Sequence, residues 1–341
     1  MLRTAPRVLV FALTLLASCA SPESPPAAPA LARMTPDPAF LKPGDTRTFK
    51  ITYVAHVTEV PTGTKSLRVW LPVPQDTAVQ TITDVAFAGA PPRMGADRKY
   101  GNRVAYWDVA NPGATLDVSY SFTCARREEI TDLAAAGADA AETDPAAAAF
   151  LTDDALTVVD DRIRRMAAEI TAGRTTSTEK ARAIYDYVLG HMKYDKSGQG
   201  WGRGDTNYAC DVGKGNCTDF HALFMSLARA SGIPAGFEIG LYLPCERGRQ
   251  EKPGGYHCWA FFRVPGRTWV PIDASEGSKV EGRAEYFFGA LTSNRVTFST
   301  GRDLVLDPPQ AGAPLNYFVN PYAEADGKPV TTSKDWTYED L

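Results

Sequence analysis

The segment at residues 214–234 reads KGNCTDFHALFMSLARASGIP and predicts an amphipathic helix. Its apolar residues recur at helical spacing on one face: Phe220, Leu223, Phe224, Leu227 and Ala228. Asn216 is a candidate N-cap, and Gly232 followed by Pro234 predicts the end of the helix. We therefore expect Cys217 in the first helical turn, where unpaired backbone N–H groups and the helix dipole stabilise a thiolate.

A cysteine at a helix start has two other interpretations. It can be a small buried apolar side chain, or one half of a disulfide. The segment at residues 254–275, GGYHCWAFFRVPGRTWVPIDAS, favours a nucleophile instead. It predicts two strands joined by a turn, with His257 on the first strand and Asp273 at the end of the second.

The length of that turn decides whether the two side chains meet. His257 and Cys258 point to opposite faces of their strand, because side chains alternate along a strand. A two-residue loop at Pro265 and Gly266 would place Asp273 opposite Cys258. An odd-length loop or a bulge would place Asp273 on the face of His257. The catalytic interpretation therefore requires the odd-length loop or the bulge.

A cysteine, a histidine and an acid in this order are the parts of a nucleophilic site. His257 would accept the thiol proton, and the carboxylate of Asp273 would hold the imidazole in the required tautomer. The backbone N–H of Cys217 is a candidate oxyanion donor. His221 lies four residues after Cys217 on the same helix face, so it is either an alternative base or a side chain that shapes the site from behind.

These motifs resemble the transglutaminase-like superfamily, a branch of the papain-like cysteine enzymes. The shared pattern is a cysteine that opens a helix ending in G-I-P, an H-x-W strand, and an aspartate after a W-x-P-x-D run; the likeness extends over residues 151–321. The resemblance implies that Cys217 is the nucleophile, His257 the general base and Asp273 its orienter. It also implies a bacterial exported subfamily in which an N-terminal β-domain is common.

The resemblance further implies that a tryptophan upstream of the cysteine is an oxyanion donor. Trp201, within the glycine-rich segment SGQGWGRGD, is the candidate. The alternative is a tryptophan that simply packs in this loop, whose composition is typical of a mobile lid. Both interpretations stay open.

Short alternating runs separated by turn residues occupy residues 46–126 and predict an antiparallel β-sandwich. The expected fold class is therefore α+β. A β-sandwich precedes a transglutaminase-like, papain-like domain in which the cysteine helix packs on an antiparallel sheet. The expected divisions are a sandwich at 46–126, a connector at 127–150, a catalytic domain at 151–322 and a tail at 323–341.

The N-terminus predicts export. Two arginines and a short apolar run precede the sequence Leu16-Ala17-Ser18-Cys19, which resembles a bacterial lipobox. We expect a signal peptide at residues 1–18, lipidation of Cys19 and a Pro/Ala-rich tether at 19–45. No aspartate follows the cysteine, so an outer-membrane anchor facing the periplasm is expected in a Gram-negative cell. The alternative is an ordinary secretory peptide with a chance cysteine.

Six cysteines are present. If Cys19 carries lipid and Cys217 is the nucleophile, an even number remains, which predicts disulfides in an oxidising compartment. The sequence favours Cys210 with Cys245 weakly, leaving Cys124 and Cys258; an alternative pairs Cys210 with Cys217 and masks the nucleophile.

The net charge of −4 gives no basis for nucleic-acid binding. No metal or cofactor motif is present, and the expected chemistry requires none. The resemblance implies attack on a peptide or carboxamide carbonyl to form a thioester, with a protein or peptide, including cell-wall peptide, as substrate. Whether water or an amine accepts the acyl group stays open. The alternatives are a non-catalytic binding lipoprotein that keeps the fold, and a surface adhesion module that binds through its β-domain.

Overall fold

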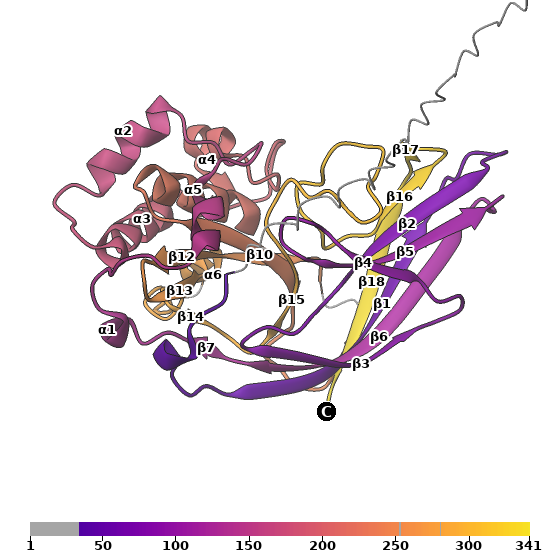
Figure 1. Cartoon of the computed structure of the whole chain (residues 1–341), viewed down its shortest axis with the longest axis horizontal. Helices are drawn as coiled ribbons and strands as arrows, with labels where there is room; N and C mark the ends of the chain where they lie inside the picture. Colours follow the sequence, from indigo (N-terminus) through magenta and orange to yellow (C-terminus); the bar gives the residue numbers. More distant parts are fainter. Residues whose placement is uncertain (1–33, 252–253, 280) are drawn as a thin grey trace, which may run out of the picture.

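The computed structural model describes residues 34–251, 254–279 and 281–341. The predicted signal peptide and Cys19 lie outside these residues. Helices gather on one side of the described chain and a β-sandwich forms the other, with a four-stranded sheet between them (Figure 1). None of the helices in the described residues is long and apolar enough to span a membrane.

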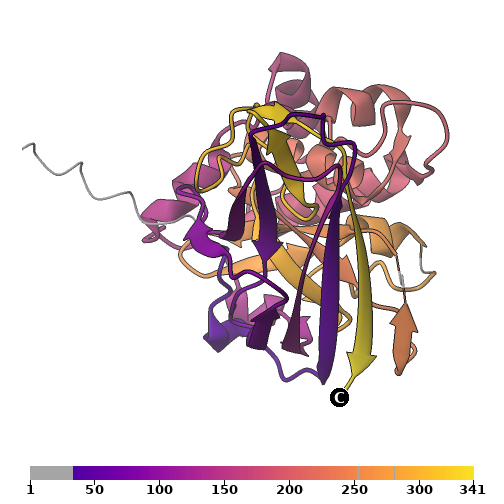
Figure 2. The same cartoon turned by 90° about the vertical axis from the view of Figure 1, so that its right-hand side faces the viewer.

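The sandwich consists of two five-stranded antiparallel sheets (Figure 2). In spatial order the first contains β11 (Arg249–Glu251), β18 (Thr332–Asp340), β1 (Thr46–Val57), β6 (Leu116–Arg127) and β3 (Gln80–Phe87). The second contains β17 (Lys328–Pro329), β16 (Tyr322–Ala325), β2 (Ser66–Val73), β5 (Arg103–Ala110) and β4 (Arg93–Ala96). Buried residues alternate along β1 and β6, which gives each sheet one apolar face. The predicted sandwich is thus confirmed.

The last residues of the chain belong to this sandwich. β18 pairs with β1 from Phe49 opposite Asp340 to Val57 opposite Thr332, and β16 pairs with β2. The expectation of a tail at 323–341 is therefore wrong. These strands lie far from the sandwich in sequence, so only the pairing with β1 and β2 reveals where they belong.

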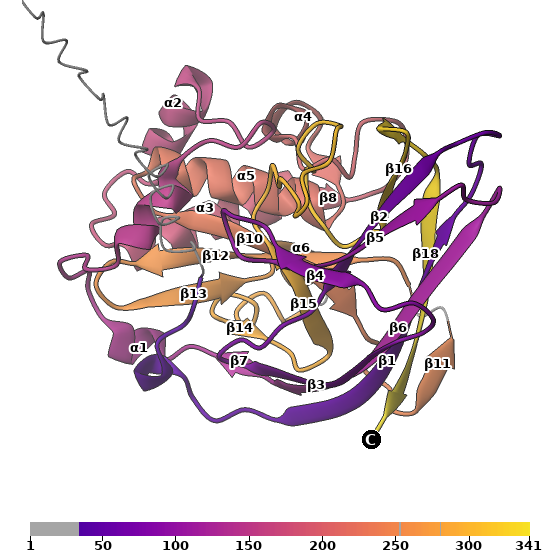
Figure 3. The same ribbon diagram turned by 45° about the vertical axis from the view of Figure 1, so that its right-hand side comes forward.

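A separate four-stranded antiparallel sheet carries the cysteine helix. Its order is β13 (Thr268–Ile272), β12 (His257–Val264), β10 (Ala235–Tyr242) and β15 (Arg295–Thr300). Its helices are α2 (Asp161–Ile170), α3 (Ser177–His191), α4 (Thr206–Val212), α5 (Cys217–Ala230) and α6 (Ala274–Lys279). α5 packs on β12 and β10 and is itself covered by α2, α3 and α4 (Figure 3). The predicted packing of the cysteine helix on an antiparallel sheet is confirmed.

Shorter elements complete the described chain. They are the 3-10 helices η1 (Pro38–Phe40) and η2 (Pro145–Leu151), helix α1 (Leu133–Ala136), and strands β7 (Glu129–Ile130), β8 (Lys193–Tyr194), β9 (Lys214–Gly215) and β14 (Ala290–Leu291). β7 pairs with β14, which fastens the end of the sandwich segment to the part of the chain that contains the four-stranded sheet.

Both faces of the four-stranded sheet are covered, so every residue of β12 is buried. Helices cover one face. On the other face, Trp259 and Trp269 share an apolar cluster with Met34, Phe150 and Trp70 of β2. Met34 lies within the segment expected as a tether and Phe150 within the expected connector. Met34 and the connector residue Phe150 are thus part of the packed structure, because their apolar side chains complete this cluster.

Candidate active site

Cys217 is the first residue of α5, as the sequence predicted. Asn216 is the N-cap: its side chain accepts the N–H of Thr218 at 3.0 Å, and the side chain of Asp219 accepts the N–H of Asn216 at 2.9 Å. This reciprocal capping fixes the first turn. The Cys217 side chain, 2% exposed, therefore lies at a rigid helix start, at the positive end of the helix dipole.

The glycine-rich loop before α4 is tied to this turn. The buried carboxylate of Asp219 accepts the N–H of Gly202 at 2.7 Å and of Gly204 at 2.9 Å, in addition to that of Asn216. Gly204 has φ +63°, and a Cβ there would lie 3.0 Å from the carbonyl oxygen of Thr218. The close approach and the positive φ both require glycine. The loop is thus a fixed wall beside the nucleophile in this structure.

The turn between β12 and β13 has the odd length that the catalytic interpretation requires. Val264 pairs with Thr268, so three residues form the loop. Continuing this register places Asp273 beyond Ile272, diagonal to His257 and on its face of the sheet. The Nε2 of His257 donates to the Oδ2 of Asp273 at 2.7 Å.

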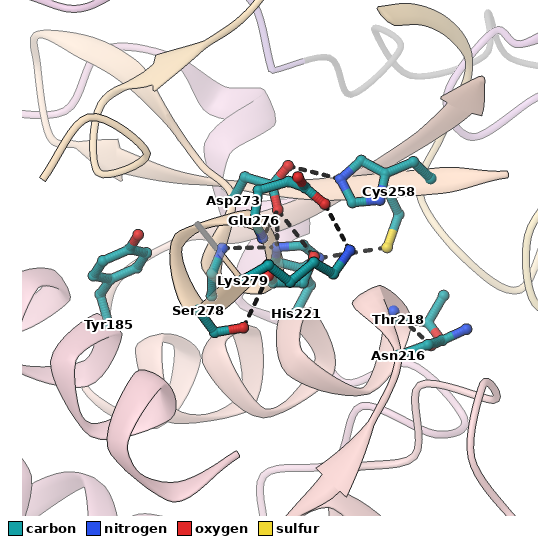
Figure 4. Close-up of polar contacts among 12 residues, drawn as sticks. Tyr185, Asn216, Thr218, His221, Cys258, Asp273, Glu276, Ser278 and Lys279 are labelled. Carbon is teal, nitrogen blue, oxygen red and sulfur yellow. Dashed lines mark hydrogen bonds and ion pairs between the residues drawn. The ribbon is translucent and has the colours of Figure 1, made fainter. Parts of the chain in front are cut away.

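Asp273 is held by more than the histidine. Its Oδ1 accepts the hydroxyl of Ser275 and the N–H of Glu276 in α6, each at 3.0 Å (Figure 4). Its Oδ2 also accepts Nη1 of Arg295 at 3.1 Å. Burial disfavours the ionised carboxylate, but His257 and Arg295 outweigh it and hold the pKa of Asp273 well below its ordinary value. The acid is therefore a permanent anion aimed at the imidazole.

His257 and Cys217 act on each other's pKa. Burial favours the neutral imidazole, but Asp273 and Cys217 overcome this and raise the pKa of His257 to about 9. Burial likewise opposes the thiolate, but hydrogen bonds with Cys258 and His257 and the charge of His257 hold the pKa of Cys217 well below its ordinary value. Because Nε2 of His257 bonds to Asp273, Nδ1 is the ring nitrogen that is left to interact with the sulfur of Cys217. At neutral pH the pair is thiolate and imidazolium.

His221 is placed behind the nucleophile and not beside the reaction path. Its Nε2 accepts the N–H of Ala274 at 3.1 Å, and its Nδ1 lies 3.4 Å from the sulfur of Cys258. Burial lowers the pKa of His221 to about 4, although Asp273 and Cys217 act in the opposite direction. Both ring nitrogens are engaged and the ring is neutral, so the geometry favours His257 as the base.

Trp201 lies in the glycine-rich loop, half-buried, with the ammonium of Lys196 at 6.0 Å from its ring. No hydrogen-bond acceptor for its indole N–H is found among the described residues. The structure thus does not join Trp201 to the other site residues, and its oxyanion role stays a prediction. Two tyrosines instead contact the loop: the hydroxyls of Tyr256 and Tyr317 donate to the carbonyl of Gly202 at 3.5 and 3.4 Å, and Tyr256 also accepts the amide of Asn216 at 3.1 Å.

The predicted disulfides are wrong for the described residues, because the five cysteines there are free: Cys124, Cys210, Cys217, Cys245 and Cys258. Cys124 is in the core of the sandwich, Cys210 is buried in α4 and Cys245 is exposed. Their elements hold them apart. Cys258 instead lies against His221 and the nucleophile.

Two side chains of the site were missed in the sequence. Arg295 is fully buried in β15, with its guanidinium 5.0 Å from the ring centre of Trp259. The available signal was an arginine that opens an otherwise uncharged strand, RVTFST, because a buried cation requires a charged partner. Cys258 was assigned to the face opposite His257. That assignment is correct, but the sequence did not show that α5, the helix that carries Cys217, packs on the same face of β12 as Cys258.

Part of the chain matches a known protein family. Residues 164–274 match the family described as the transglutaminase-like superfamily. A protein of Haemophilus influenzae, described as uncharacterised, is 32% identical over 213 residues, which is 53% of this chain and 58% of that protein. The chain thus spans little more than half the length of this relative.

Solved structures show a similar fold. A candidate cysteine protease from Cytophaga hutchinsonii has a TM-score of 0.61 and 17% identity, over 88% of this chain and 93% of that chain. The periplasmic domain of TgpA from Pseudomonas aeruginosa has a TM-score of 0.35 and 14% identity, over 67% of this chain and 87% of that one. The second likeness is too distant to carry an argument. The first, at its low identity, shows a shared fold alone.

Proposed function

We propose that this chain, which contains a transglutaminase-like superfamily domain, is a cysteine peptidase or acyltransferase that acts on peptide or carboxamide bonds. The observation that carries the proposal is the buried series Cys217, His257 and Asp273, with the His257–Asp273 bond at 2.7 Å. It supplies a thiolate, an acid that can protonate a leaving group, and a fixed carboxylate that orients it.

The chemistry follows from these charges. The Cys217 thiolate attacks the carbonyl carbon, and the oxygen gains negative charge near the backbone N–H of Cys217 at the start of α5. The imidazolium of His257 gives its proton to the departing amine, which leaves a thioester on Cys217 and a neutral imidazole. The imidazole then takes a proton from water or an amine as that group attacks. Departure of the product restores the thiolate and the imidazolium.

A trapping experiment tests the proposal. The soluble chain, without residues 1–19, is incubated with a mixed peptide library and hydroxylamine, which converts a thioester to a hydroxamate. We expect hydroxamate products, and an acyl adduct on Cys217 when the reaction is quenched in acid. Cys217→Ala should give neither, and Cys210→Ala, which removes a cysteine outside the site, should give both. Reaction without hydroxylamine then separates hydrolysis from transfer to amines.

The opposite result would support a different class of function. If the wild-type chain gives no adduct with any peptide while Cys217 remains a free thiol, the chain is a non-catalytic binding protein that keeps the fold. Retention of its cellular role by Cys217→Ala would agree with that conclusion.

We also propose that the protein is exported and anchored through a lipid on Cys19, facing the periplasm from the outer membrane in a Gram-negative cell. The support is the lipobox-like sequence Leu16-Ala17-Ser18-Cys19 and the proline-rich residues that follow. Metabolic labelling with a palmitate analogue tests this. Label that is absent from Cys19→Ser supports the anchor, and an unlabelled wild-type protein contradicts it.

A further inference from the structure

The nucleophile has a second sulfur beside it. Cys258 lies on the face of β12 that packs on α5, as shown by Phe262 on the same face, whose ring lies 6.4 Å from that of Phe224. Cys217 and His221 precede Phe224 by seven and three residues, so all three lie on one side of the helix. The packing of strand on helix therefore brings Cys258 to both Cys217 and His221.

The hydrogen bonds of His221 decide where its proton lies. The N–H of Ala274 donates to Nε2 at 3.1 Å, so this nitrogen carries no hydrogen. The ring is neutral, because burial lowers the pKa of His221 to about 4. Its one N–H is therefore on Nδ1, which donates to the sulfur of Cys258 at 3.4 Å (Figure 4). The sulfur of Cys258 thus accepts a hydrogen bond from Nδ1 of His221.

The thiol hydrogen of Cys258 is then free to donate elsewhere. Cys258 remains a thiol, because burial and the neighbouring Cys217 raise its pKa well above the ordinary value. The neighbouring side chains of Cys258 and Cys217 act on each other's pKa, which raises that of Cys258 and lowers that of Cys217. Since Cys217 is the thiolate of the two, the remaining hydrogen belongs to Cys258 and is available to the Cys217 sulfur.

We propose that Cys258 is a positioning residue, fixed by His221, whose S–H donates to the Cys217 sulfur and stabilises its thiolate. The inference rests on the proposed function, because it assigns a role toward that nucleophile. The backbone N–H of Ala274, the ring of His221 and the thiol of Cys258 form one series of donors that ends at the reactive sulfur. Asp273, which directly precedes Ala274, orients His257 on the other side of the nucleophile.

Other ionisable groups also act on Cys217 and must be held constant in a test. They are Tyr194 on β8, Asp219 and His221 on α5, Tyr256 and His257 at the start of β12, and Tyr317. A change confined to Cys258 leaves every one of them in place.

The test measures the reactivity of Cys217 without a substrate. The reduced soluble chain is alkylated with iodoacetamide from about pH 4 to about pH 10, and the rate is followed on the tryptic peptide of residues 215–229, which contains Cys217 alone. We expect Cys258→Ala to move the midpoint upward by about one to two pH units, the effect of losing one hydrogen bond to a charged group. Cys258→Ser keeps a hydrogen-bond donor, so its midpoint should lie close to that of wild type.

Controls separate this inference from folding and from the proposed function. Cys258→Val keeps the side-chain volume and should shift like Cys258→Ala, while Cys210→Ala should not shift. Equal midpoints in wild type, Cys258→Ala and Cys258→Val would overturn the inference, as would equal shifts in Cys258→Ser and Cys258→Ala. If these midpoints agree while His257→Ala still raises the midpoint, only the role of Cys258 fails. If His257→Ala has no effect, the proposed function fails.

Discussion

Cys217 and His257 share one proton, and this sharing determines how they affect stability. Between about pH 6.5 and pH 8.5 the unfolded chain carries the proton on the thiol, and its imidazole is neutral. In the folded protein the proton is on His257, whose pKa is raised to about 9 against the effect of burial, while Cys217 is a thiolate. Both states bind one proton, so the pair adds no pH dependence to the free energy of unfolding in this window.

Removing the sulfur of Cys217 should make the free energy of unfolding depend on pH in this window. In Cys217→Ala the folded protein still binds a proton on His257 beside Asp273, whereas the unfolded chain binds none in the upper part of the window. The free energy of unfolding should therefore fall relative to wild type as pH rises from about 6.5 to 8.5, by up to about 1.4 kcal/mol per pH unit. Urea unfolding at three pH values measures the difference.

The double variant Cys217→Ala/His257→Ala is the control for this prediction. It lacks both titrating groups, so its difference from wild type should stay constant over the same pH range. A constant difference for Cys217→Ala alone would show that His257 is neutral without the thiolate, and that Asp273 does not by itself hold its proton.

The glycine-rich loop depends on a single carboxylate. Asp219 accepts three backbone N–H groups, two of them from the loop. Asp219→Asn keeps the shape of the side chain but turns an amide NH₂ toward N–H donors. Because hydrogen bonds to charged groups are the strong ones, we expect the variant to lower the free energy that holds the loop in place by about 2 to 4 kcal/mol. We expect trypsin to cleave after Arg203, on this loop, faster in the variant. Cleavage after the exposed Arg247 is the internal control, and equal acceleration at both sites would contradict a local effect.

The C-terminal strand supports the site from a distance. Trp336 in β18 is 2% exposed, and its indole N–H donates to the carbonyl of Gly254 at 2.7 Å, just before β12 and His257. Trp336→Ala should lower the free energy of unfolding by about 3 to 5 kcal/mol, because it leaves a large cavity. Glu339→Ala on the exposed part of the same strand should change it by less than about 0.5 kcal/mol. Chemical unfolding followed by circular dichroism measures both, and similar small values would argue against a structural role for β18.

Local patterns predicted the elements that depend on neighbours in sequence. The helix at Cys217 and its N-cap Asn216 follow from apolar spacing and capping, and five of the six sandwich strands between residues 46 and 127, all except β4, follow from alternation. The requirement for an odd-length loop before Asp273 also held, with three residues in the turn. These features are set within about twenty residues of chain.

Features set by distant contacts were not predicted. β18 resembles a polar tail, because only alternate residues such as Trp336 and Tyr338 are buried and its partner β1 lies at the other end of the chain. Arg295 in β15 reaches Asp273, which follows β13 at the opposite edge of the same four-stranded sheet. The role of Cys258 depends on which helix covers its face. In each case the decisive neighbour comes from a separate element, which periodicity cannot identify.

At the scale of the whole molecule, the sandwich and the catalytic sheet are packed together on two sides. Phe298 of β15 lies 5.9 Å from the ring of Tyr53 in β1 and equally close to Phe122 in β6. Trp70 of β2 joins the cluster on the far face of the sheet that contains Trp259. Trp259 lies two residues from His257 along β12, and its indole N–H donates to Glu238 at 3.0 Å. The sandwich thus forms part of the core on which the catalytic strand lies.

This shared core predicts that the two parts unfold together. Calorimetry of the soluble chain should show one transition, with equal calorimetric and van't Hoff enthalpies. Met34→Ala should lower the free energy of unfolding by about 2 to 5 kcal/mol and move the whole transition, because Met34 fills the cluster between the parts. Thr35→Ala, at an exposed neighbour, should have little effect. Two separate transitions, with Met34→Ala shifting only one, would mean that the sandwich and the catalytic sheet fold independently, and that the apolar contacts between them add little to the stability of the site.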